Sequence, residues 1–260
     1  MAFTRTARHV VAISPDGTKI AFIAKEQIYL RQIDELEARP IRGTDVDPID
    51  FAFSPDGESI AFFVMGMVGG PSAKGATLKR IGVVGGKAVT VCPAGLPFGI
   101  RWQGSTIVFS LGDSIQRVDD RGGTPETLVS VKPDSGESFA QPQLLNEGRA
   151  LLYTVRPGGA RTFNDGQIVV QSLEPKGDRR VLVNGGIDGR VVSSGLASPT
   201  PLPVDATKYI SGALGRMYDV SRDGQQFLLV KPLNADEKRS QSLTIVTHWF
   251  DVLRAAMKGT

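Results

Sequence analysis

The sequence predicts an all-β protein, and more specifically a β-propeller. The nonapeptide SPDGTKIAF at residues 14–22 returns forty residues later as SPDGESIAF at 54–62, and a looser copy, SRDGQQFLL, occupies 221–229. Repeats with a period near forty are typical of propeller blades. The 260 residues include 30 glycines and 16 prolines, which suits many short strands joined by tight turns. We expect six blades, one of them degenerate, with a five-bladed or incompletely closed ring as the alternative.

Each copy of the repeat predicts a tight turn between two strands. Serine, proline, aspartate and glycine in succession favour a type I turn, because proline presets φ, aspartate accepts nearby N–H groups and glycine permits the exit conformation. Apolar residues flank each turn, as in a β-hairpin. We therefore assign the aspartates to turns rather than to catalysis or metal binding. The turn residues are Ser14, Pro15, Asp16, Gly17, Ser54, Pro55, Asp56, Gly57, Asp223 and Gly224.

The first two blades are predicted from alternating apolar and polar residues. In the first blade this alternation predicts strands at 20–24 and 27–33 and an outer strand at 39–41. In the second blade a glycine-rich insertion, 66–75, separates the middle strands. The insertion is partly apolar, so it is either a loop that contacts a partner or a tolerated disordered segment. The candidate partner-loop residues are Met65, Met67, Val68 and Lys74.

The later blades lose most of the motif but keep its rhythm. Turn glycines fall at positions 17, 57, 104, 148 and 224, and the last interval is nearly two blades wide. We expect a degenerate blade in that interval, with 190–193 as a weak strand candidate. Apolar residues at helical spacing then predict a short terminal helix at 249–258. The single domain is divided into blades at 9–44, 45–91, 92–131, 132–185, 186–214 (the degenerate blade) and 215–248.

Composition argues against several classes of function. The chain has 30 basic and 27 acidic residues, for a net charge of +3. The sequence shows no concentrated group of basic residues that would indicate a nucleic-acid partner. A single cysteine, Cys92, excludes an internal disulfide framework and a multi-cysteine metal site. No apolar stretch has the length of a membrane span, and residues 1–9 lack the apolar core of a signal peptide. The chain by itself is expected to be soluble, and cytoplasmic if it is complete as given.

The sequence also lacks the motifs of several classes of enzyme. The sequence contains no G-x-S-x-G nucleophile elbow and no phosphate-binding loop. Its two histidines, His9 and His248, stand at opposite ends of the chain. The densest group of carboxylates, Asp45, Asp47 and Asp50, is expected to be a solvated linker. We therefore expect no enzymatic activity, no cofactor and no bound metal.

The repeats resemble those of a known group of proteins. The turn followed by Ile-Ala-Phe, at 14–22 and 54–62, resembles the TolB-type, WD40-like propeller repeat. The closing pattern, at 218–229 and 243–250, resembles the C-terminal end of propellers attached to bacterial serine/threonine protein kinases. This resemblance implies an extracytoplasmic or periplasmic sensing module, and it carries no defined set of binding residues. The chain departs from those kinases in showing no kinase motif and no membrane span.

Three functional hypotheses follow. The leading one is a non-catalytic interaction or sensing module for a protein or small-molecule ligand, since loops on a rigid scaffold concentrate binding residues. The second is a propeller enzyme of the lyase or hydrolase type, which would need carboxylates around the channel and a bound cation. The third is a truncated propeller without independent function.

Overall fold

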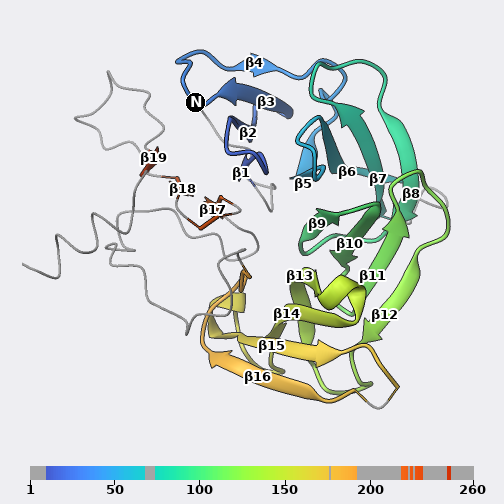
Figure 1. Cartoon of the computed structure of the whole chain (residues 1–260). Helices are drawn as coiled ribbons and strands as arrows, with labels where there is room; N and C mark the ends of the chain where they lie inside the picture. Colours follow the sequence, from blue (N-terminus) through green and yellow to red (C-terminus); the bar gives the residue numbers. More distant parts are fainter. Residues whose placement is uncertain are drawn as a thin grey trace, which may run out of the picture.

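The computed structural model describes residues 10–67, 74–175, 177–191, 218–221, 223–224, 226–230 and 245–246. These residues form four four-stranded sheets and one three-stranded sheet, arranged around a common centre (Figure 1). Within each sheet the strands follow one another in chain order, with antiparallel neighbours. The predicted all-β propeller fold is confirmed.

The strands expected at 20–24, 27–33 and 39–41 are present, within a residue of the expected bounds. The first sheet contains β1 (Val11–Ile13), β2 (Lys19–Ala24), β3 (Gln27–Gln32) and β4 (Arg39–Pro40), and the second contains β5 (Pro48–Phe53), β6 (Ser59–Met67), β7 (Lys74–Gly82) and β8 (Val89–Ala94). The third contains β9 (Ile100–Gln103), β10 (Thr106–Ser110), β11 (Ser114–Asp119) and β12 (Glu126–Ser130). The fourth contains β13 (Ser138–Leu145), β14 (Ala150–Arg156), β15 (Gln167–Ser172) and β16 (Arg179–Asn184). The last contains β17 (Tyr218–Val220), β18 (Phe227–Leu229) and β19 (Ile245–Val246). Two short 3-10 helices, η1 (Asn146–Gly148) and η2 (Phe163–Asp165), complete the described elements.

Two expectations need correction. The stretch 66–75 is not a loop throughout, because Gly66 pairs with Gly75 and Met67 with Lys74. Antiparallel pairing therefore extends β6 and β7 into it, and only 68–73, with Val68, lies outside the described residues. The strand expected at 190–193 is also wrong where it can be examined, since 190 and 191 belong to no strand. The rest of the degenerate blade, 192–214, and the helix at 249–258 lie outside the described residues.

The core consists of apolar clusters between neighbouring sheets. One cluster joins the last sheet, through Leu228, to the first and second sheets. A second joins the second sheet to the third, where Phe63 and Phe109 meet edge to face with ring centroids 5.5 Å apart. A third joins the third sheet to the fourth. Each sheet thus buries its faces against its neighbours, as propeller blades do.

The repeated motif forms a hydrogen-bonded turn in its two full copies and in the loose one. The N–H groups of Gly17, Gly57 and Gly224 donate to the carbonyl oxygens of the motif serines at 2.8, 2.9 and 2.9 Å. The glycine φ angles of 73°, 72° and 73° lie in the left-handed region, which explains the choice of glycine. Partial burial raises the pKa of Asp16, but hydrogen bonds from Ser14 and Thr18 outweigh it and lower that pKa to about 2.

Candidate functional site

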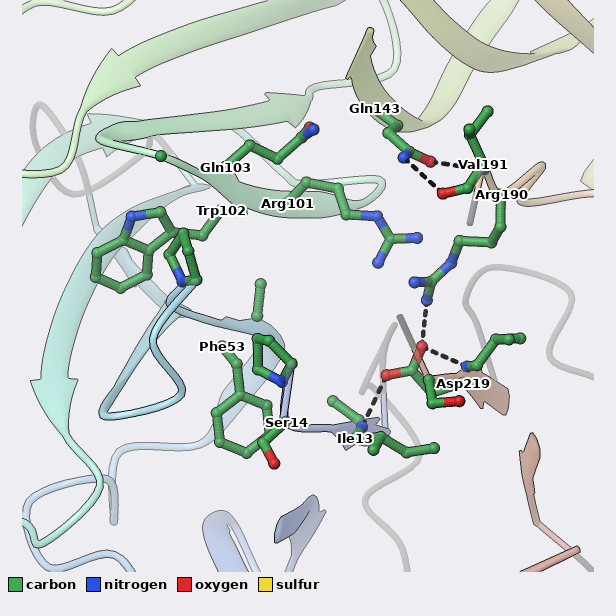
Figure 2. Close-up of a pocket in the computed structure, with 17 residues that line it drawn as sticks. Ile13, Ser14, Phe53, Arg101, Trp102, Gln103, Gln143, Arg190, Val191 and Asp219 are labelled. Carbon is green, nitrogen blue, oxygen red and sulfur yellow. Dashed lines mark hydrogen bonds and ion pairs between the residues drawn. The ribbon is translucent and has the colours of Figure 1, made fainter. Parts of the chain in front are cut away.

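A cavity of about 340 Å³ lies where the inner strands of the sheets end (Figure 2). Its walls come from the carboxyl ends of β1, β5, β9, β13 and β17, or from the turns that follow them, and from residues 190 and 191. All five described sheets therefore contribute to it. Its volume is within the range of pockets that hold small ligands.

The inner strands contribute to the cavity from one shared register position. At this position, a residue of the inner strand pairs with a residue of the second strand. That second-strand residue directly precedes a large apolar residue. The five residues are Ala12, Ala52, Arg101, Gln143 and Asp219, and their partners are Ala21, Ala61, Val108, Leu152 and Leu228. All five line the cavity. Alanine at the first two positions leaves space, and the other three supply polar groups.

An ion-pair network connects three parts of the ring beside the cavity. Arg101 Nη2 donates to Asp188 Oδ1 at 3.0 Å, and Arg190 Nε lies 3.4 Å from Asp188 Oδ2. Arg190 Nη2 also pairs with Asp219 Oδ1. The second oxygen of Asp219 accepts the backbone N–H of Ile13 at 2.8 Å, from a residue 206 positions away. Asp219 therefore joins the last sheet to the first.

Two glutamine side chains each pair with the backbone of a neighbouring segment, as one strand pairs with the next. Gln103 donates to the carbonyl of Leu144 at 2.9 Å and accepts the Leu144 N–H at 2.8 Å. Gln143 makes the same pair with Val191, at 3.2 Å in both directions. Residues 188–191 are thus held on one side by the fourth sheet and on the other by Asp219. They occupy the inner position between the fourth and last sheets, in the interval of the degenerate blade.

The pKa values of the two arginines, Arg101 and Arg190, shift in opposite directions. Burial lowers the pKa of Arg101, and the adjacent Arg190 guanidinium lowers it further against the effect of Asp188. For Arg190, burial lowers the pKa, but the carboxylates of Asp219 and Asp188 outweigh this and raise it. Burial and the Asp188 charge raise the pKa of Tyr218, whose hydroxyl donates to the backbone oxygen of Asp188 at 2.8 Å. Arginine is not deprotonated in proteins at neutral pH, so both guanidiniums carry a positive charge.

Most residues selected from the sequence lie at the rim of the cavity or away from it. Ser14, Pro15 and Pro55 are among its lining residues, whereas Asp16, Asp56 and Asp223 are not. Met65, in β6, is 39% exposed and does not line the cavity. Sequence reasoning missed Arg101, Asp188, Arg190 and Asp219. One signal was available for Asp219: it stands two places before the motif serine, where the two full repeats have alanine.

The carboxylates at 45, 47 and 50 do not behave alike. Asp45 is exposed, but Asp50 lies in β5 and is fully buried, so the expectation of a solvated linker is wrong for that residue. Among the residues that the structure describes, no three His, Cys, Asp or Glu side chains gather as a possible metal site. Within the same part of the chain, no helix has the length and apolar character needed to cross a membrane.

Cys92 is buried in the cluster between the second and third sheets, and burial raises the pKa of its thiol to about 11. Because the thiolate is the reactive form, we expect Cys92 to react with a disulfide reagent at pH 8 at least about a hundredfold more slowly than free cysteine. The rate should rise with pH up to about 11. Reaction of one thiol after unfolding in urea is the control. A native rate equal to that of free cysteine would contradict the prediction.

Comparison with known proteins agrees with this architecture. No protein-family model matches the sequence, and no curated protein matches it either. Solved structures do match: TolB from Acinetobacter baumannii has a TM-score of 0.54 at 18% identity, over 86% of this chain and 49% of that one. A TolB candidate from Agrobacterium tumefaciens has a TM-score of 0.55 at 12% identity, over 94% and 81% of the two chains. A chain of the mitotic checkpoint complex has a TM-score of 0.51 at 15% identity, over 91% and 86%.

These similarities and the sheet arrangement define a β-propeller fold. The fold is similar to that of the two TolB structures. The chain spans about half the length of the Acinetobacter TolB chain. At these identities the likeness establishes the fold alone.

Proposed function

We propose that this chain is a non-catalytic interaction or sensing module that takes its ligand at the cavity at the centre of the ring. The observation that carries the proposal is that the inner strands of all five described sheets converge on this cavity from one register position. A site built by all five described sheets is held by their joint arrangement, and a rigid scaffold of this kind favours a pre-formed binding site.

The state of the acidic side chains supports binding over catalysis. A propeller enzyme of the lyase or hydrolase type would need carboxylates free to hold a cation or move a proton. Asp188 and Asp219 are both engaged by arginine, and Asp219 also accepts backbone N–H groups. Asp16 and Asp56 each accept hydrogen bonds within their own turns. These carboxylates serve the structure of the ring.

The proposal is tested with a library of tripeptides capped at both ends and covering acidic, basic and apolar side chains. We expect backbone amide NMR signals of Ile13, Gly104 and Val220 to shift on binding, with those of the outer strand β16 unchanged. Mass spectrometry should recover the peptides intact after prolonged incubation. Shifts confined to outer strands on binding would overturn the cavity as the binding face. Turnover that persists through repurification would overturn the non-catalytic role.

We further propose, from the resemblance of residues 218–229 and 243–250 alone, that the module derives from the extracytoplasmic part of a bacterial serine/threonine protein kinase. In that setting the cavity would face the periplasm or the exterior and would sense a ligand there. Reading the adjacent coding sequence tests this part. We expect a kinase domain and a membrane span encoded in the same frame, and an unrelated neighbour would contradict the derivation.

A further inference from the structure

The cavity presents positive charge to an entering ligand. Its charged lining residues are Arg101, Arg190 and Asp219. The side chains of Arg101 and Arg190 are 13% and 18% exposed, whereas those of Asp188 and Asp219 are 0% and 6% exposed. The carboxylates are thus less accessible than the guanidiniums. Figure 2 shows the two guanidinium groups turned toward each other in the cavity.

Unused donors remain on these arginines. A guanidinium carries five N–H donors, and within the described part of the chain Arg101 donates through Nη2 alone, to Asp188. The side-chain amides of Gln103 and Gln143 each donate one N–H to a backbone carbonyl and accept one backbone N–H. The lining hydroxyls of Ser14 and Ser221 donate to the aspartates of their turns. A planar fork of unused N–H groups matches the two oxygens of a carboxylate.

At Arg101, the nearby carboxylates do not fully offset the effects of burial and of the second guanidinium on the pKa. Burial and the neighbouring Arg190 both lower the pKa of Arg101. An anion placed between the two guanidiniums would offset their mutual repulsion, which solvent screens weakly because both side chains are largely buried. Binding of a neutral group there would bring no such gain.

The opposite wall of the cavity is apolar. Trp102 and Phe53 lie across from the arginines in Figure 2, and Ile13 adjoins them. Proline rings at 15 and 55 extend this wall. Aromatic and aliphatic surface of this kind contributes affinity through burial of apolar ligand area. The cavity is therefore cationic on one side and apolar on the other.

We propose that the cavity binds a carboxylate carried by an apolar or aromatic group of about the size of one amino acid. The carboxylate lies between Arg101 and Arg190, and the apolar group packs against Trp102 and Phe53. This inference rests on the proposed function, since it names the ligand class of the same cavity. The carboxylate can belong to a free small acid or to the C-terminus of a peptide.

The test compares N-acetylphenylalanine with its uncharged amide by calorimetric titration of the full chain. We expect the acid to bind at least about tenfold more tightly, because only the acid can engage the arginine fork. The peptide N-acetyl-Ala-Ala-Phe with a free C-terminus separates the two sources. Tighter binding of the peptide than of the single residue assigns the site to peptide C-termini, and equal binding assigns it to small acids.

A matched pair of variants at Gly104 keeps the test independent of folding. Gly104 lines the cavity with a φ of +59°, and nothing lies within 4 Å of the position of an added Cβ. Asparagine and aspartate both tolerate this conformation. Gly104→Asp should lower the affinity for the acid by about tenfold through charge repulsion, and Gly104→Asn by less than about twofold. Neither should affect the amide.

Arg101→Lys provides a second variant, since it keeps the charge near Asp188 and removes the fork. We expect it to weaken binding of the acid by about tenfold. Equal binding of acid and amide, equal effects of Gly104→Asp and Gly104→Asn, or no binding of the acid at about 10 mM would overturn the inference. If the capped tripeptides still bind in the cavity, the interaction module stands and only the ligand class fails.

Discussion

Asp219→Ala should lower the free energy of unfolding by about 3–5 kcal/mol, the range for breaking a buried ion pair at one partner. The substitution removes the acceptor for the Ile13 N–H and one of the two carboxylates that hold Arg190. Because Ile13 and Asp219 belong to the first and last sheets, the lost contacts are those between the two ends of the ring. Urea unfolding followed by circular dichroism measures the change.

Two comparisons make this prediction specific. Asp219→Asn keeps an oxygen acceptor for Ile13 and should cost less than the alanine substitution. Asp119→Ala removes an exposed ion pair with Arg121, whose side chain is 80% exposed, and should have little effect. Hydrogen exchange at the Ile13 amide should accelerate in Asp219→Ala. A loss of stability no larger than that of Asp119→Ala would show that ring closure does not depend on Asp219.

Phe109→Ala should also lower the free energy of unfolding by about 3–5 kcal/mol. Phe109 is fully buried in β10 and meets Phe63 of β6 edge to face across the second and third sheets. Removing its ring leaves a cavity between two sheets that the surrounding strands, paired on both sides, have little freedom to close. The same urea unfolding experiment measures the loss.

Conservative and exposed substitutions serve as controls for the ring contact. Phe109→Leu keeps most of the volume and should cost about 1 kcal/mol. Leu36→Ala, at a side chain that is 94% exposed, should change stability by less than about 0.5 kcal/mol. A double-mutant cycle with Phe63→Ala should give a coupling energy of about 0.5–1.5 kcal/mol. Zero coupling would mean that the edge-to-face contact does not stabilise the interface.

The strands followed from the sequence because their determinants are local. The turn of the repeat is closed by hydrogen bonds between residues two to five places apart, such as Ser14 with Asp16 and with the N–H of Lys19. Alternation of apolar residues then places each strand around the turn. The extension of β6 and β7 past Met65 was not predicted, because glycines at 66 and 75 favour a loop. Pairing between the two strands overrides that local preference.

Only a small part of the candidate binding site could be predicted from the sequence. Asp219 could be recognised by aligning the repeats, because it replaces the alanines at 12 and 52. Arg101, Asp188 and Arg190 could not, because the pairs that join them to the third and last sheets link residues far apart along the chain. Arg101 and Asp188 are 87 positions apart, and no short-range pattern relates them.

Local sequence patterns were enough to predict that this protein is built from repeated β-hairpins and to locate their turns to within a residue or two. What these hairpins enclose depends on how the sheets pack together. A ring of sheets brings one register position from each inner strand to the same place, so residues that are unremarkable in their own repeats become the walls of one cavity. The charged groups of the cavity form ion pairs across the ring. These pairs depend on the arrangement of the sheets and not on any local sequence pattern.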